Sequence, residues 1–375
     1  MTQEDMTELD RVGNAPHPRF VTELFGQRDA EKRFLAAYNA GRADTAWLIT
    51  GPRGVGKATL AWRIARFALS AAADSKPGSN PHSSLHVDAT HPTARRIAAL
   101  SETTLTLIRR QVDTKSGKPQ SGITVGQIRS LIDFFALTSA DNLPIVAIID
   151  SADDLNTSAA NALLKLLEEP PDNSMMLLVS HSPFSLPATI RSRCRFLSCK
   201  PLGEKDMRRA LAGTGCLRQS GEDHLSGISV GSVGETLRFH FDGGFECHNR
   251  LLALLAQAPG MKRGELMKFA EACGGRNAES QYLVSVSAIQ YLLSGLARWA
   301  AGVETPPPPA DCSHLIKARH SAYIWAELNA ELFQRFQHSR LTNLDPVSVV
   351  LDMLIALDKS ASAAARQESH PHASH

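Results

Sequence analysis

Hydrophobic and polar positions follow two alternating patterns in the first half of the chain. Short apolar runs that are typical of buried strands occur at residues 46–50, 144–150 and 175–180. Segments with apolar residues at helical spacing occur at residues 60–69 and 126–135. Because strands alternate with helices, the pattern predicts an α/β fold with a parallel sheet over about residues 20–200.

The second half of the chain has a helical pattern after Pro201. A short helical segment is expected up to about residue 244. Longer helices are expected near residues 250–257, 280–300, 322–336 and 347–357. Four consecutive prolines at 306–309 divide this half into two helical blocks and are interpreted as a stiff connector.

Three segments carry no regular pattern. Residues 1–19 are polar, and the tail 361–375 is rich in Ala, Ser and His, so both are expected to be disordered. Residues 71–122 are rich in Ser, Pro, Gly and His and are interpreted as an insertion into the α/β domain, with a hairpin or loop at 115–122.

A glycine-rich loop follows the strand expected at 46–50. Its sequence is Gly51-Pro-Arg-Gly-Val-Gly-Lys57-Ala58, with glycines at 51, 54 and 56. In a phosphate-binding loop, Gly51, Gly54 and Gly56 let backbone N–H groups face phosphates that Lys57 also reaches. The strand before the loop and the helix after it support descent from a true P-loop.

The residue after Lys57 departs from the P-loop pattern. A Ser or Thr at this position normally holds Mg²⁺, but Ala58 has no hydroxyl. Thr59 lies one position further, rotated about 100° around the helix, so it is no simple replacement. The loop therefore resembles a nucleotide site that lacks a metal ligand.

A second departure follows the apolar run at 144–150. Asp150 stands at the strand end, where a Walker B acid supports Mg²⁺, but Ser151 follows it instead of the glutamate that activates water. Asp153 and Asp154 are interpreted as helix-entry residues, because acids are favoured near helix N-termini. Two losses at one site favour a nucleotide fold retained for its shape.

Composition narrows the class of protein. The net charge is +2, with 40 basic and 38 acidic residues, so it gives no general case for nucleic-acid binding. The sequence has neither an apolar run near membrane-spanning length nor a signal-peptide pattern, and we expect a cytoplasmic protein without membrane contact. The six cysteines lack C-x-x-C spacing, which favours free thiols.

Two further motifs follow the apolar run at 144–150 and its acidic end. Residues 156–171 predict a helix that Asn156 or Thr157 caps and that two prolines end. After the strand at 175–180, residues 189–195 are expected to form a cationic turn with arginines at alternate positions, which suits a solvated rim or a phosphate-facing patch. These arginines are Arg191, Arg193 and Arg195.

The run Ser158-Ala-Ala-Asn-Ala-Leu-Leu-Lys-Leu-Leu-Glu-Glu-Pro-Pro171, with Pro187-Ala-Thr-Ile-Arg-Ser-Arg-Cys194, resembles the bacterial clamp-loader AAA+ family of DNA polymerase III. The missing hydroxyl and glutamate make the chain most similar to the delta-prime group of that family. The resemblance is strong over about residues 20–200. Ser192-Arg193-Cys194 matches the family's SRC motif, which implies that Arg193 is an arginine finger acting on a neighbouring subunit.

The resemblance also identifies departures from active family members. Ser180 and His181 fall near the sensor-1 position without a good polar match. Residues 231–236 resemble the start of the sensor-2 helix, but Glu235 stands about where active loaders place an arginine. The family's four-cysteine zinc module has no counterpart, because no cysteine precedes Cys194, so we expect no zinc.

The resemblance implies an architecture and a set of partners. A P-loop AAA+ α/β domain is expected at 20–200, a small helical lid at 201–244 and an all-α collar for oligomerisation at 245–360. The chain would bind ATP weakly or not at all and catalyse nothing alone. Its partners would be an ATPase motor subunit and the delta subunit, with the sliding clamp and primed DNA contacted through the complex.

Two other functions stay open at this point. An active AAA+ ATPase would need Thr59 or water to complete the Mg²⁺ shell and Asp153 or Asp154 as a base. A purely structural scaffold would need no arginine finger.

Overall fold

The structure, a computed structural model, describes residues 11–43, 46–74, 81–112, 120, 122–138, 144–216, 231–274, 278–303, 310–316, 320–342 and 344–366. These residues form two compact units. Of the described residues, those from 11 to 216 and from 231 to 235 belong to the first unit, and those from 236 to 366 belong to the second. All candidate site residues of the P-loop, the strand end and the SRC motif belong to the first unit.

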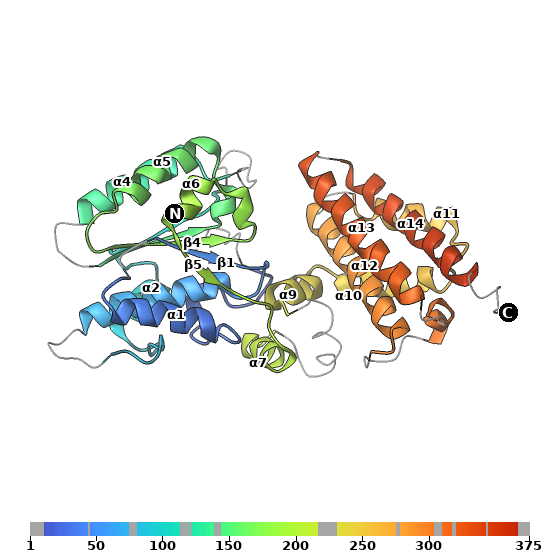
Figure 1. Ribbon diagram of the computed structural model, residues 1–375, viewed down its shortest axis with the longest axis horizontal. Coiled ribbons are helices and arrows are strands. Elements are labelled where there is room, and N and C mark those ends of the chain that lie inside the picture. The colour runs from blue at the N-terminus through green and yellow to red at the C-terminus, as the bar shows by residue number, and fades with distance from the viewer. Residues whose placement is uncertain are drawn as a thin grey trace, which may run out of the picture. The chain divides into compact units, whose positions relative to one another are not determined.

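Five parallel strands among the described residues form the sheet of the first unit (Figure 1). They are β1 (Ala46–Thr50), β2 (Leu105–Ile108), β3 (Ile145–Asp150), β4 (Ser174–Ser180) and β5 (Arg195–Ser198). Their order across the sheet is β2-β3-β4-β1-β5. The carboxyl ends of parallel strands meet at one edge, so the segments that follow β1, β3 and β4 are neighbours there.

Helices cover both faces of this sheet. In the first unit they are η2 (Pro18–Phe20), α1 (Arg28–Asn39), α2 (Lys57–Ala73), α3 (Pro92–Ala98), α4 (Val125–Thr138), η4 (Ala152–Asp154), α5 (Thr157–Glu168), η5 (Pro183–Ser185), α6 (Ala188–Arg193) and α7 (Glu204–Thr214). Figure 1 shows α4, α5 and α6 over one face, and α1 and α2 over the other. Alternate strand residues supply each face, as Leu48 of β1 and Leu178 of β4 do in the core beneath α5.

Most of the predicted elements of the first unit are confirmed. The three strands and the helices near 60–69, 126–135 and 156–171 are present. Asn156 caps α5, since its side chain accepts a hydrogen bond from the Ala159 N–H at 2.8 Å. The expected α/β P-loop fold with an all-helical C-terminal region is confirmed.

The expected insertion at 71–122 needs a correction. The helix α2 continues to Ala73, and β2 pairs in parallel with β3, so part of this range belongs to the sheet. A four-residue edge strand gives only a short signal in a polar context, and its pairing with β3 decides the conformation. Much of the loop expected at 115–122 lies outside the described residues.

The expected disorder of residues 1–19 is wrong for residues 11–19. His17 is only 1% exposed, and its ring lies edge-on to Trp62 of α2 at a centroid distance of 6.0 Å. Arg66 of α2 donates a hydrogen bond to the Arg19 carbonyl at 2.7 Å. The buried Arg66 of α2 thus binds this polar segment, a contact between residues distant in sequence. Residues 1–10 lie outside the described part.

The second unit is built from helices alone among its described residues. They are α9 (Val233–Phe241), which begins in the first unit, α10 (Gly244–Leu255), α11 (Arg263–Glu271), α12 (Ala278–Ala300), η6 (Ala310–Leu315), α13 (Ser321–Leu341) and α14 (Pro346–Arg366). The four predicted long helices are confirmed and extend further, and α11 is additional. The expected lid range 201–244 contributes α7 to the first unit and most of α9 to the second.

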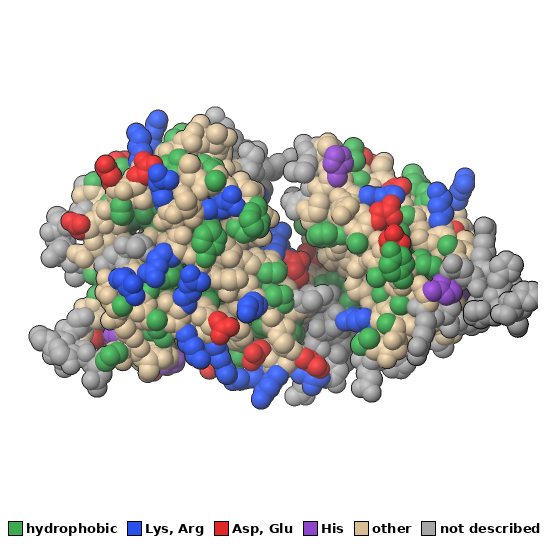
Figure 2. Space-filling view, in the orientation of Figure 1, with side chains coloured by type: hydrophobic (Ala, Val, Ile, Leu, Met, Phe, Trp, Pro, Cys, Tyr) green, Lys and Arg blue, Asp and Glu red, His purple; other side chains and the backbone are tan. Residues whose placement is uncertain are grey.

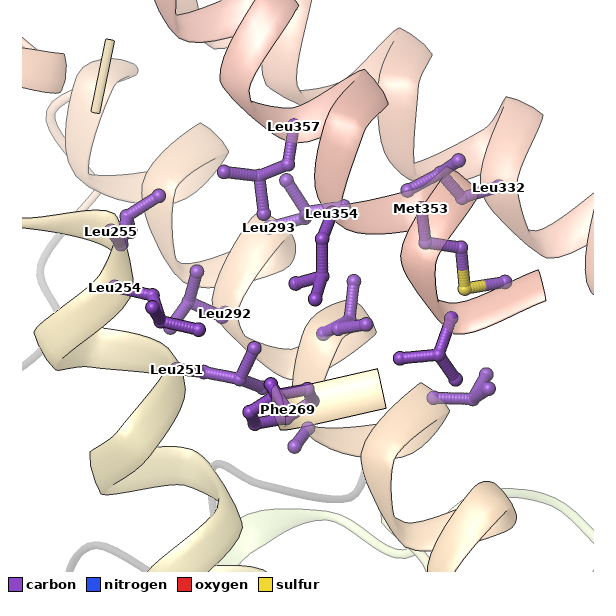
Figure 3. Close-up of a cluster of buried hydrophobic side chains, with 14 of the residues drawn as sticks. Leu251, Leu254, Leu255, Phe269, Leu292, Leu293, Leu332, Met353, Leu354 and Leu357 are labelled. Atoms are coloured by element: carbon purple, nitrogen blue, oxygen red, sulfur yellow. The ribbon is translucent and has the colours of Figure 1, made fainter. Parts of the chain in front are cut away.

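One apolar core joins these helices. Figure 3 shows side chains from α10 to α14 pointing toward a common centre, including Leu254, Phe269, Leu293, Leu332 and Leu354. Side chains at helical spacing bury one stripe of each helix in this way. The proline run 306–309 lies outside the described residues.

The expected disordered tail 361–375 is also corrected in part. The helix α14 continues to Arg366, and Ala361 is fully buried in the core of the second unit. Alanine favours helix and fits closely against neighbouring helices, so a segment read as low complexity extends α14. Among the described residues, no helix combines the length and apolar character needed to cross a bilayer.

Candidate functional site

The P-loop connects β1 to α2 at the carboxyl edge of the sheet. Gly51 has φ 142, a region that residues with a side chain rarely adopt. A Cβ atom there would overlap the carbonyl oxygen of Cys199, which follows β5. Only glycine fits at this position, so the first turn of the loop is fixed by the backbone of the neighbouring strand.

Lys57 is turned back onto its own loop. Its Nζ donates hydrogen bonds to the carbonyl oxygens of Gly51 at 2.7 Å and Pro52 at 2.6 Å. The residue is 3% exposed, and burial lowers the pKa of Lys57 to about 8, although Asp150 and Asp153 act in the opposite direction. The ammonium that a P-loop offers to phosphates is therefore bound to backbone oxygens.

A segment that precedes and begins α9 lies directly on the loop. Gly234 donates a backbone hydrogen bond to the Gly54 carbonyl at 3.0 Å, and Ser232 Oγ donates to the Arg53 carbonyl at 2.7 Å. A Cβ atom at Gly234 would lie 2.7 Å from the Cα of Gly54. The Arg53 guanidinium lies 4.0 Å from the carboxylate of Glu235. The predicted sensor-2 helix start thus covers the loop, and Glu235 faces the loop's own arginine.

Gln27, at the start of α1, binds the loop from another side. Its Nε2 donates to the carbonyls of Val55 at 3.1 Å and Lys200 at 2.7 Å, and its Oε1 accepts from the Lys200 N–H at 3.0 Å. This buried amide joins the P-loop to the end of β5. The sequence analysis missed Gln27, because its partners lie far along the chain.

The acidic strand end contains one carboxylate with several donors. Asp153 accepts hydrogen bonds from Ser151 Oγ at 3.0 Å, Ser180 Oγ at 2.7 Å, the His181 N–H at 2.5 Å and the Ser182 N–H at 3.3 Å. Asp153 therefore joins the end of β3 to the end of β4. Both oxygens of this carboxylate are thus occupied by donors of the same chain.

Asp153 and Asp154, interpreted from the sequence as helix-entry residues, lie in the first turn of a short helix that precedes α5. Asn156 caps α5, while the two aspartates lie in the short helix η4. Asp154 pairs with Arg110 at 3.2 Å; burial raises the pKa of Asp154, and Arg110 opposes this change. Ser180 and Ser182, at the end of β4, were the sequence signal for the role of Asp153. The ends of β3 and β4 are neighbours in the sheet, so small polar residues at one strand end can bind an acid at the other.

The SRC motif lies at the end of a short helix, α6, where the sequence predicted a turn. Pro187 precedes this helix, and the side chain of Ile190, a residue of α6, is fully buried. The burial of Ile190 stabilises the helical conformation of this short segment. Ser192 Oγ donates to the Thr189 carbonyl at 3.1 Å. Cys194 is buried, and burial raises the pKa of its thiol to about 12, so it packs as an apolar residue.

Arg193 is exposed and paired within its own chain. Its Nη2 lies 2.8 Å from Glu168 Oε1 at the end of α5, and its Nη1 donates to the Thr189 carbonyl at 3.1 Å. The side chains of Arg193 and Glu168 are 37% and 49% exposed. An ion pair this open to water is weak and exchanges readily.

The other two arginines of the predicted cationic turn have separate environments. Arg191 lies over the ring of Phe184, 5.1 Å from its centroid, whereas Arg195 lies over Trp47 at 4.7 Å and donates to the Arg42 carbonyl. Arg191 belongs to α6 and Arg195 to β5. Because the backbone passes from helix to strand between them, their side chains point in different directions. They do not form one phosphate-facing patch.

A basic surface lies near α7. Figure 2 shows Lys and Arg side chains gathered around this helix on the visible face. A cavity of about 290 Å³ there is lined by Gly26, Arg28, Asp29, Lys205, Asp206 and Arg209. Its acidic and basic side chains are mixed, so it has no clear preference for an anion. In the described parts of the chain, no group of three or more His, Cys, Asp and Glu side chains is arranged to hold a metal ion.

Known proteins resemble the first unit. Residues 26–203 match the family described as "DNA polymerase III, delta subunit". The DNA polymerase III subunit delta' of Pseudomonas aeruginosa is 34% identical over 163 residues, covering 42% of this chain and 44% of that protein. The DNA polymerase III subunit gamma of Buchnera aphidicola is 27% identical over 190 residues, covering 51% of this chain and 47% of that protein.

A shorter match has higher identity. The DNA polymerase III subunit delta' of Yersinia pestis is 44% identical over 84 residues, covering 22% of this chain and 25% of that protein. This chain thus spans less than half the length of each of these relatives. Residues 26–203, just under half of the chain, are thus similar to DNA polymerase III subunits, which supports membership of the clamp-loader family.

Proposed function

We propose that this chain is a delta-prime subunit of the DNA polymerase III clamp loader. In this role it does not hydrolyse ATP itself. It supplies Arg193 to the ATP site of an adjacent motor subunit while the complex loads the sliding clamp on primed DNA. A guanidinium suits this task because it stays charged and offers a planar set of donors to the transferring phosphoryl group.

The contrast between Lys57 and Arg193 carries the proposal. The P-loop ammonium is buried against the carbonyls of Gly51 and Pro52, whereas the guanidinium of Arg193 is exposed at the end of α6. Ala58 offers no hydroxyl to Mg²⁺, and Ser151 offers no carboxylate to water. Relatives include both gamma and delta' subunits, and these residue differences favour the delta-prime assignment.

The remaining features of the role are part of the same proposal. The P-loop binds ATP weakly or not at all, since Ser232 and Gly234 cover it and Lys57 is already bound. The helices of the second unit act as the collar that contacts the motor and delta subunits. The chain reaches clamp and DNA through this complex, in the cytoplasm, and needs no zinc.

Replacing the arginine finger tests the proposal. In the complete clamp-loader complex, Arg193→Ala is expected to slow ATP hydrolysis at the adjacent site by roughly 10³-fold or more, the range found for arginine fingers. Hydrolysis by the complex then falls by that site's share, and clamp loading falls with it. The free energy of unfolding of the chain changes by less than about 0.5 kcal/mol, because the side chain is exposed.

Arg208→Ala is the matched control. Arg208 is also exposed and forms an ion pair on a helix, with Glu204 at 2.5 Å. This variant is expected to keep both activities and assembly. If Arg193→Ala assembles and retains full hydrolysis and clamp loading, the chain is a structural scaffold and the finger is excluded.

A further inference from the structure

The finger proposed above is not free, because Glu168 of α5 holds it. Glu168 Oε1 lies 2.8 Å from Arg193 Nη2, and the Thr189 carbonyl accepts from Nη1 at 3.1 Å. Both terminal nitrogens of the guanidinium are therefore bound to acceptors of the same chain. We infer that Glu168 is a positioning residue that keeps Arg193 in a resting position until a neighbouring ATP competes for it. This inference rests on the proposed finger role.

Arg193 cannot bind Glu168 and a neighbouring ATP phosphate fully at the same time, for an electrostatic reason. A terminal phosphate of ATP is anionic, like the Glu168 carboxylate, and two anions on the same side of one guanidinium repel each other. Arg193 must therefore give up Glu168 before its charge can act fully on phosphate in an adjacent subunit. The carboxylate sets an electrostatic threshold that the bound nucleotide has to exceed.

The position of Glu168 gives a local reason for the pair. Glu168 is the last residue of α5, and Glu169 is its C-cap. The helix dipole disfavours negative charge at this end, so a nearby cation is the favourable partner. Glu169 is also exposed, but no ion pair of Glu169 is found in the parts of the chain that the structure describes. Geometry thus selects one of two adjacent glutamates.

The exposure of the pair limits its strength. Side chains that are 37% and 49% exposed form an ion pair worth no more than about a fivefold change in an equilibrium. Such a contact can hold Arg193 between cycles and still release it to a phosphate that carries more charge. We expect a device that adjusts the frequency of engagement, rather than one that blocks it.

Charge removal at Glu168 tests the inference in the complete complex. In Glu168→Gln, the neutral amide keeps the shape of the side chain and loses the anion that competes with phosphate. We expect the kcat/KM for ATP hydrolysis without clamp or DNA to rise about two- to fivefold, in line with an exposed ion pair. The increase should shrink as salt screens the pair in the unmodified protein.

Two further variants separate this role from a structural one. Glu169→Gln, the matched control, should leave hydrolysis unchanged. Glu168→Gln with Arg193→Ala should behave as Arg193→Ala alone, because Glu168 acts only through Arg193. A purely structural effect of Glu168 would persist in the double variant.

The outcomes distinguish the two proposals. If Arg193→Ala reduces hydrolysis but Glu168→Gln equals the unmodified complex or lowers its rate, the resting-position inference is overturned and the finger stands. If Arg193→Ala has no effect, the finger proposal fails and the role of Glu168 fails with it.

Discussion

The two basic residues Lys57 and Arg193 belong to the same α/β unit and have opposite environments. Lys57 is buried, and its two hydrogen bonds go to backbone carbonyls of its own loop. Arg193 lies on the surface, where its acceptors are an exposed carboxylate and a carbonyl at the end of a helix. A buried charge bound to fixed dipoles is structural, whereas an exposed ion pair exchanges with solvent and partners.

One acid also joins the end of β3 to the segment that leads to Arg193. Asp153 accepts hydrogen bonds from the end of β4, and the chain continues from there through η5 to α6. Hydrogen bonds from side chains and from the backbone thus occupy the Asp153 carboxylate, in a region where an active nucleotide site needs groups free for water and metal. This comparison supports the proposal that the unit does not hydrolyse ATP itself and presents Arg193 to a neighbouring subunit.

The largest expected effect follows from adding a methyl group at the closed loop. Gly51→Ala combines an unfavourable φ with overlap of the Cys199 carbonyl. We expect the free energy of unfolding of the first unit to fall by about 4 kcal/mol, the sum of backbone strain and overpacking. Native-state hydrogen exchange of β1 amides measures the loss in that unit.

Gly213→Ala is the control for this substitution. Gly213 lies inside α7, where the nearest atom to a new Cβ is 3.9 Å away. Alanine there should stabilise the chain by about 0.5 to 1 kcal/mol, because it favours helix over glycine. Equal effects at the two positions would show that the loop is not closed as described.

The next effect is a dependence on pH that belongs to Lys57. Its pKa is lowered from 10.5 to about 8 in the folded chain. Between these pH values the unfolded chain binds a proton that the folded chain does not, so the free energy of unfolding rises with pH. The rise is at most about 3.5 kcal/mol, at about 1.4 kcal/mol for each pH unit of the difference.

Variants at two lysines isolate this contribution. Lys57→Met should lose the rise between pH 8 and 10.5, measured by urea unfolding at several pH values. Lys165→Met, at an exposed position of α5, should keep the dependence of the unmodified chain. An unchanged slope in Lys57→Met would mean that its ammonium is not buried in the folded state.

The smallest expected effect is that of nucleotide on the isolated chain. A ligand present at its own Kd stabilises a protein by about 0.4 kcal/mol. We expect millimolar ATP with Mg²⁺ to give less than this, measured by thermal unfolding and by isothermal titration. The motor subunit of the same complex is the positive control.

Restoring the missing hydroxyl sharpens this result. Ala58→Thr supplies the metal ligand but leaves Lys57 bound and the loop covered by Ser232 and Gly234. This variant should therefore still bind no nucleotide. Magnesium-dependent turnover by the unmodified chain would instead support an active ATPase.

Local signals in the sequence were sufficient for several features of the site. The glycine spacing of residues 51–56 and the apolar run before it predicted the strand, loop and helix that the structure contains. Ala58 and Ser151 could be recognised as losses, because P-loop chemistry requires particular side chains at fixed positions. The Asn156 cap was predictable too, since its hydrogen bond closes within three residues.

Other features depend on residues that are distant along the chain. Gln27 binds residues 28 and 173 positions away, and Ser232 binds Arg53 across 179 positions. No periodicity or short motif reports such pairs. The edge strand β2 and the ordered segment 11–19 were missed for the same reason, because β3 and α2 stabilise them.

Residue chemistry alone identified a nucleotide-type domain that lacks two groups expected for hydrolysis, and the family resemblance singled out Arg193. Packing alone brought Lys57 onto the carbonyls of its loop and placed Glu168 beside Arg193. The reason is physical: a motif specifies which atoms are available within one turn of chain. Which acceptor a lysine or an arginine meets depends on the burial and long-range contacts that folding creates.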